Sequence, residues 1–112
     1  MGRQTISMES DFKNIIERSI ALREKYHELE VKQNGSEWTA EQDALGFLTD
    51  AGLVGRLTMS QQGTWRKGDR DLPELKHKLG ECNWWLAVLA HRMDIDLNEV
   101  TEEFLTKTEK LF

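Results

Sequence analysis

Apolar residues recur every three or four positions along most of this 112-residue chain. Side chains of an α-helix return to the same face after about 3.6 residues, so this spacing is typical of amphipathic helices. It predicts four helices, over about residues 11–32, 40–59, 72–92 and 97–111. The chain has one proline and few β-branched clusters, a composition that also favours helices over strands. The predicted fold class is therefore all-α, with short connections.

Two of the predicted helices begin at a capping box, in which two residues bind each other's backbone N–H groups through their side chains. Thr39 followed by Gln42 is this signal for the second helix, and Asp96 followed by Glu99 repeats it for the fourth. These pairs place the first turn of each helix without reference to the rest of the chain.

The other two helices have different start signals. Asp71 precedes the third helix, followed by Glu74 and with Pro73 in the first turn, where proline is tolerated. Ser10 or Asp11 is predicted to cap the first helix. Every predicted helix therefore has a local signal for its first turn.

The apolar faces of the helices predict a core. The second helix is apolar on more than one side, which is typical of a central, buried helix. The third helix has two apolar sides, and the longer one is predicted to face the core. The residues of this predicted core stripe are Leu75, Leu79, Cys82, Leu86, Leu89 and Met93. In the fourth helix the residues predicted to point inward are Val100, Phe104 and Leu111.

The other apolar side of the third helix carries Trp84, Trp85 and Val88. Together with Phe47, the two tryptophans form more bulky apolar surface than a bundle of this size easily hides. A contiguous exposed patch of this kind is normally covered by another subunit. We therefore expect a four-helix bundle that is completed by homo-oligomerisation, as a homodimer or a tetramer.

The length of the chain indicates how many domains it forms, and its net charge indicates which kinds of partner it binds. We expect residues 1–10 to be a flexible leader and residues 11–112 to form a single helical domain. The net charge of -5 argues against nucleic acid or an anionic membrane as a partner. No apolar run approaches the roughly 20 residues that span a bilayer, and the lone Cys82 cannot form an internal disulfide. The expected location is the cytoplasm.

Asp50 lies in the middle of the most apolar predicted helix, at helical spacing with Phe47 and Val54. An ionised carboxylate there is costly unless a cation, hydrogen bonds or water compensate it. Two interpretations stay open. Asp50 is either a boundary residue, which faces a water-filled groove or pairs with Arg56 or Lys78, or a ligand of a metal ion.

The third helix carries a matching set of polar residues. Steps of three and four residues place these side chains on one face: Glu74, His77, Lys78 and Glu81. Facing carboxylates on two packed helices, here from Asp50 and Glu81, form the oxygen-rich site that Mg²⁺ or Mn²⁺ prefers. The same spacing is also typical of a solvated helix face, so both interpretations stay open.

Two segments resemble the MazG-like, all-α nucleoside triphosphate (NTP) pyrophosphohydrolases. Residues 49–54, Thr-Asp-Ala-Gly-Leu-Val, resemble the first motif of that family, Glu-Glu-x-Gly-Glu-Leu. Residues 77–81, His-Lys-Leu-Gly-Glu, with the apolar run that follows, resemble the second, Glu-Glu-Leu-Gly-Asp. Residues 94–97 match the turn before the family's last helix, and the similarity extends in order over about residues 11–112. It implies a four-helix MazG-like bundle.

In that family, acids from the two motifs hold Mg²⁺, which binds the triphosphate and helps activate a water, so that pyrophosphate is released and the monophosphate remains. The resemblance implies that Asp50 and Glu81 stand at two of the four metal-binding positions. The other two fall on Leu53 and Lys78, which supply no ligand for Mg²⁺. At the positions with which the family's last helix faces the nucleotide, this chain has Phe104, Thr108, Leu111 and Phe112.

Other residues offer substitutes for the missing contacts. Glu74 and His77 lie one turn before Lys78 and Glu81, and are predicted to restore part of a ligand set for Mg²⁺ or Mn²⁺. Positive charge for a triphosphate is available around the connection between the second and third helices: Arg56, Arg66, Lys67 and Arg70. The residues predicted to bind the substrate are Arg56 and Lys78 for its phosphates, and Trp38 and Trp65 for its base.

Three functions stay open from the sequence. The first is a MazG-like nucleotide pyrophosphohydrolase with a remodelled metal site, which converts an NTP or dNTP to the monophosphate and pyrophosphate. The second is a MazG-fold protein that binds a nucleotide, a related phosphate or a protein partner, with weak or no catalysis. The third is a helical dimer without a small ligand, in which Asp50 and Glu81 are ordinary boundary residues.

Overall fold

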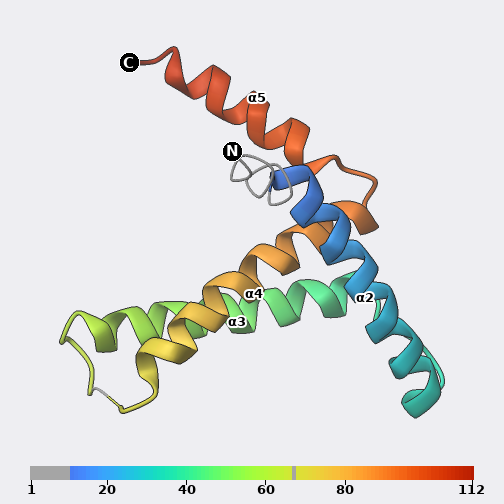
Figure 1. Cartoon of the computed structure of the whole chain (residues 1–112), viewed down its shortest axis with the longest axis horizontal. Coiled ribbons are helices and arrows are strands. Elements are labelled where there is room, and N and C mark those ends of the chain that lie inside the picture. The colour runs from blue at the N-terminus through green and yellow to red at the C-terminus, as the bar shows by residue number, and fades with distance from the viewer. Residues whose placement is uncertain (1–10, 67) are drawn as a thin grey trace, which may run out of the picture. The chain divides into compact units, whose positions relative to one another are not determined.

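The computed structural model describes residues 11–66 and 68–112, and over these residues the chain is all-helical, with four helices and no strand (Figure 1). The helices are α2 (Phe12–Asn34), α3 (Ala40–Gln61), α4 (Asp71–Arg92) and α5 (Leu97–Glu109). The all-α prediction is confirmed, and every predicted helix end lies within two residues of the observed one. The leader expected at residues 1–10 lies outside the described residues. Within the described ranges, no helix has both the length and the apolar character needed to cross a membrane.

Side chains at the helix starts hold three of these first turns. Asp11 caps α2. At α3 the capping box is complete, because Thr39 Oγ1 accepts from the Gln42 N–H at 3.1 Å and Gln42 Oε1 accepts from the Thr39 N–H at 2.8 Å. At α5, Asp96 Oδ1 accepts from the Glu99 N–H at 3.0 Å. The predicted starts of these helices are confirmed, since each cap binds backbone donors that the helix itself leaves without partners.

Asp71 acts differently from the prediction. It is the first residue of α4, and its carboxylate reaches back to the α3–α4 connection instead of capping the helix. One oxygen, Oδ2, accepts from the Gly68 N–H at 2.8 Å and also from the hydroxyl of Ser60, which is 1% exposed. Asp71 thus ties the connection to both helices. We call Ser60, Gly68 and Asp71 the loop latch.

The described chain forms two compact units. One contains the described residues up to Glu37 together with Ala87–Phe112, and the other contains Trp38–Leu86, so α4 contributes to both. In the first unit α2 contacts α5, and Arg92 Nη1 lies 3.2 Å from His27 Nε2. A guanidinium group only donates hydrogen bonds, so the His27 nitrogen accepts this one. The bond joins the end of α4 to α2 within the first unit.

The prediction of the core face of α4 is right only in part, because Leu75, Cys82 and Leu89 of the predicted stripe are half-buried. The buried apolar residues of the described chain are Trp85, Ala87, Val88 and Ala90, whereas Leu79, Leu86 and Met93 of the predicted stripe are exposed. The tryptophan side turns inward because the Trp85 indole N–H donates to Asp50 Oδ2 at 2.9 Å, a polar anchor that apolar spacing does not reveal. The sequence predicts that Trp85 belongs to an exposed apolar patch. The structure contradicts this, because Trp85 is buried.

The α3 helix is also less buried than its apolar character predicts. Leu45 and Leu48 are 62% and 65% exposed in the single chain, and the buried α3 residues are Asp43, Asp50 and Ser60. The residues of the last predicted helix that were expected to point inward are exposed as well: Val100 and Phe104 of α5, and Leu111, which lies beyond the end of α5. Apolar spacing overestimates burial here because it counts apolar side chains whether or not anything packs on them. Homo-oligomerisation that covers these side chains stays a prediction. Sedimentation velocity tests it by measuring the oligomeric state in solution.

Candidate functional site

Polar side chains of α3 and α4 meet within the Trp38–Leu86 unit. The Lys78 ammonium donates to Asp50 Oδ1 and to Glu81 Oε1, both at 3.0 Å. The second oxygen of Asp50 accepts from the Trp85 N–H. Of the two interpretations that the sequence left open for the buried Asp50, this structure contains the ion pair with Lys78. We call Asp50, Lys78 and Glu81 the ion cluster.

Hydrogen bonds set the charges of Asp50 and Lys78. Burial raises the pKa of Asp50, but the hydrogen bonds from Trp85 and Lys78 outweigh burial and hold this pKa below its usual value of 3.8. The bonds to Glu81 and Asp50 raise the pKa of Lys78 above its usual value of 10.5. Burial, and then the two nearby carboxylates, raise the pKa of the Cys82 thiol. At neutral pH Asp50 and Lys78 are therefore charged, and the thiol is protonated.

The ion cluster does not fit a divalent metal ion in this arrangement. Mg²⁺ requires near-octahedral coordination by oxygen ligands, whereas the two carboxylates here converge on an ammonium group. His77 Nε2 lies 3.7 Å from Glu81 Oε1, but its side chain is 76% exposed. Within residues 11–66 and 68–112, no three His, Cys, Asp or Glu side chains lie close enough together to hold a metal ion. The substitutes predicted at Glu74 and His77 thus form no ligand set with the ion cluster in this structure.

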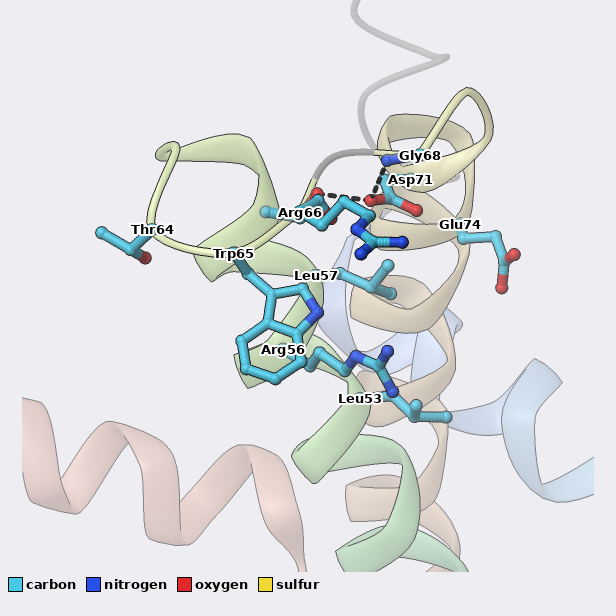
Figure 2. A pocket seen from close by; sticks show the side chains of 10 residues that line it. Leu53, Arg56, Leu57, Thr64, Trp65, Arg66, Gly68, Asp71 and Glu74 are labelled. Carbon is cyan, nitrogen blue, oxygen red and sulfur yellow. Dashed lines mark hydrogen bonds between the residues drawn. The ribbon is translucent and has the colours of Figure 1, made fainter.

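A pocket of about 710 Å³ lies on the same two helices, where α3, the α3–α4 connection and the first turn of α4 meet (Figure 2). Its lining residues are Leu53, Arg56, Leu57, Ser60, Thr64, Trp65, Arg66, Gly68, Asp71 and Glu74. Three predicted site residues, Arg56, Trp65 and Glu74, come together here. The Arg56 guanidinium carbon lies 5.2 Å from the centre of the Trp65 ring, a cation–π contact.

Two arginines give the pocket its chemical character. Figure 2 shows the guanidinium groups of Arg56 and Arg66 beside the apolar lining, with the Glu74 carboxylate turned away from them. The Asp71 carboxylate is bound within the loop latch, so hydrogen-bond donors compensate part of its charge. Two guanidinium groups beside the exposed indole of Trp65 suit a ligand with one anionic part and one flat aromatic part.

The other predicted substrate contacts lie outside the lining of this pocket. Lys78 belongs to the ion cluster. Trp38 stacks on Trp85, with ring centres 6.5 Å apart and an angle of 11° between the planes. Lys67, which the sequence also suggested as a source of positive charge, lies outside the described residues. The structure therefore gathers Arg56 and Trp65 into one pocket and assigns Trp38 a packing contact.

Two features of this region were not predicted. The first is Trp85 as the partner of Asp50, although steps of three and four residues from Lys78 to Glu81 to Trp85 do place all three on one face of α4. The second is the loop latch. No signal in the sequence marks it, because Asp71 lies 11 positions after its partner Ser60.

Asp71→Ala is expected to lower the free energy of unfolding by about 1–3 kcal/mol, because it removes the acceptor of the buried Ser60 hydroxyl and of the Gly68 N–H. Urea denaturation measures this change. Glu74→Ala is the matched control, since it removes an exposed acid from the same turn of α4 and should change stability by less than about 0.5 kcal/mol. Equal losses in both variants would contradict the role of the latch.

The fold and the site define an all-α protein with an ion cluster and an arginine-lined pocket on α3 and α4. Comparison of the chain with protein-family profiles, with curated proteins and with solved structures gives no match. The MazG-like resemblance thus rests on residues 49–54 and 77–81 and on the order of the helices around them.

Proposed function

We propose that the chain is a MazG-like protein that binds a nucleoside triphosphate or a related phosphate in the pocket lined by Arg56, Arg66 and Trp65, with weak or no catalysis. The observation that carries this proposal is the presence of two guanidinium groups and an exposed indole in one pocket of about 710 Å³. Pockets for small ligands measure about 300–1,000 Å³, so the volume suits a nucleotide. The MazG-like motifs on α3 and α4 point to the same class of ligand.

The phosphates and the base of a nucleotide each have a matching group in the pocket. Planar guanidinium groups bind phosphate oxygens through paired, charge-assisted hydrogen bonds. A base that stacks on an aromatic side chain such as Trp65 gains about 1–3 kcal/mol. Weak catalysis follows from Leu53 and Lys78, because they stand at two of the positions that the resemblance assigns to metal-binding acids.

A second candidate is metal-dependent pyrophosphohydrolase activity in the same region. It is favoured by the ion cluster, in which Asp50 and Glu81 approach one ammonium group from two different helices. If Lys78 moved away, these carboxylates and Glu74, one turn earlier on α4, would be the ligands for Mg²⁺ or Mn²⁺. Pyrophosphate release that is lost in both Asp50→Ala and Glu81→Ala would establish this candidate, whereas intact turnover in both would exclude it.

Isothermal titration calorimetry with a panel of NTPs and dNTPs tests nucleotide binding. We expect at least one to bind, and expect Arg56→Gln and Arg66→Gln each to weaken its affinity by about 10–100-fold, since a hydrogen bond to a charged group contributes about 1.5–3 kcal/mol. Arg70→Gln is the matched control: it removes the same charge from the same connection but lies outside the pocket lining. Its effect should stay below about fivefold.

Two results would contradict the proposal. One is the failure of every nucleotide in the panel to bind. The other is an equal loss of affinity in all three arginine variants, which would indicate general charge attraction and not contacts within the pocket.

A further inference from the structure

We propose that Lys78 is a built-in cation of the α3–α4 site, which takes the place of a divalent metal ion and makes the binding of a phosphate ligand independent of Mg²⁺. The MazG-like resemblance assigns this position to an acid, and the chain has a base there. That the ligand is a phosphate compound rests on the proposed function. That Lys78 stands in place of a metal ion rests on the contacts of the ion cluster alone.

The ammonium lies where two carboxylates converge. Asp50 comes from α3 and Glu81 from α4, and each has one oxygen 3.0 Å from Lys78 Nζ. The side chains of Lys78 and Asp50 are 20% and 12% exposed, so water screens their attraction only in part. Because the other oxygen of Asp50 accepts from Trp85, the carboxylate is held in its orientation toward Lys78.

A divalent ion would have to displace this ammonium. Two cations cannot share the same two carboxylate oxygens without strong repulsion, because charges a few ångströms apart interact strongly where water is partly excluded. Mg²⁺ also gives up its bound waters reluctantly and needs several oxygen ligands. Leu53, at another position that the resemblance assigns to an acid, supplies none. The positive charge that the buried Asp50 requires is thus provided by Lys78 itself.

The two carboxylates of the ion cluster do not use all the donors of the ammonium. It has three N–H groups, and its bonds to Asp50 and Glu81 use two of them. Glu74, one turn before Lys78 on α4, lines the arginine pocket, so the pocket and the ion cluster occupy successive turns of that helix. Lys78 itself lies outside the lining of that pocket. A phosphate chain that extends from the pocket by one turn of α4 would meet its ammonium, with no metal between protein and ligand.

Titration with Mn²⁺ alone, followed by electron paramagnetic resonance, tests the inference without a nucleotide. We expect the Mn²⁺ titrations of the wild type and of Asp50→Asn to be the same, because Asp50 holds no Mn²⁺ in the wild type. Lys78→Glu combined with Leu53→Glu places acids at the two positions that the resemblance assigns to them. We expect this variant to bind Mn²⁺ at least about 100-fold more tightly than the wild type, since even the outer partners of a metal site contribute about 10–100-fold.

The matched control is Lys76→Glu combined with Leu53→Glu, which makes the same change in charge at an exposed position of α4 and should gain no Mn²⁺ affinity. A folded Lys78→Glu/Leu53→Glu variant that binds no better than this control overturns the inference. Wild-type binding of Mn²⁺ that is lost in Asp50→Asn also overturns it. If the Lys78→Glu/Leu53→Glu variant lacks the helical circular dichroism of the wild type, it is not folded. The comparison of Mn²⁺ binding by the wild type and by Asp50→Asn then decides whether the inference holds.

Nucleotide affinity of the wild type, measured with Mg²⁺ and with EDTA, separates this inference from the proposed function. We expect the two affinities to agree, and a requirement for Mg²⁺ would overturn the inference while nucleotide binding itself still stood. Failure of every nucleotide to bind would contradict the proposed function instead. The Mn²⁺ titration would then still decide whether Lys78 stands in place of a metal.

Discussion

Trp85→Ala is expected to lower the free energy of unfolding by about 3–5 kcal/mol, the usual cost of removing a large aromatic side chain from a core. Trp85 is 6% exposed, stacks on Trp38 and has its ring centre 4.8 Å from that of Trp84. The substitution removes this packing together with the N–H donor to Asp50. Since small domains have only about 5–15 kcal/mol of stability, a large part of it depends on this one residue.

Urea denaturation, followed by far-UV circular dichroism, measures the loss of stability in Trp85→Ala. Two further variants show which interactions of Trp85 cause this loss. Trp65→Ala makes the same change at an exposed tryptophan and should cost less than about 1 kcal/mol. Trp85→Phe keeps most of the ring but removes the N–H, and is expected to cost about 1–3 kcal/mol because Asp50 Oδ2 loses its donor. Similar losses in Trp85→Ala and Trp65→Ala would contradict the buried position of Trp85.

Gly46→Ala is expected to destabilise the protein by about 1–3 kcal/mol, although alanine normally favours a helix over glycine by about 1 kcal/mol. A Cβ atom at this position would lie 2.8 Å from Cζ2 and 3.0 Å from Cη2 of Trp85, and 3.4 Å from Cζ3 of Trp38. The Trp85 ring is rigid and is held by its bond to Asp50, so it has little freedom to move away. Overpacking is therefore expected to outweigh the gain in helix propensity.

Gly52→Ala is the control for this prediction, because it is the same substitution in the same helix, and beyond its chain neighbours and the nearby backbone of α3 the new Cβ has nothing within 4 Å. We expect it to stabilise the protein by about 0.5–1 kcal/mol. The two variants should thus shift the midpoint of urea denaturation in opposite directions. A stabilising effect of Gly46→Ala like that of Gly52→Ala would show that Trp85 does not pack against α3 at Gly46.

The candidate site was predicted in part. Asp50 and Glu81 stand out in the sequence because carboxylates on apolar helices require a partner, and Lys78 is one of the partners that helical spacing offers. Arg56 and Trp65 are predicted from the sequence by residue type alone. Their separation of 5.2 Å depends on the path of the α3–α4 connection, which the loop latch holds through contacts that the sequence does not signal.

The sequence by itself determined the four helices, since helix starts depend on bonds between residues three positions apart, such as Thr39 with Gln42. Only the tertiary structure decided which face of α4 is buried, because Trp85 finds its partner, Asp50, 35 positions earlier in the chain. It also decided that the ion cluster is closed by Lys78 and that the arginines share a pocket with Trp65. Periodic spacing shows which residues share a face of one helix, but it does not show which residue of another helix they bind, so apolar spacing and capping signals do not identify such distant partners.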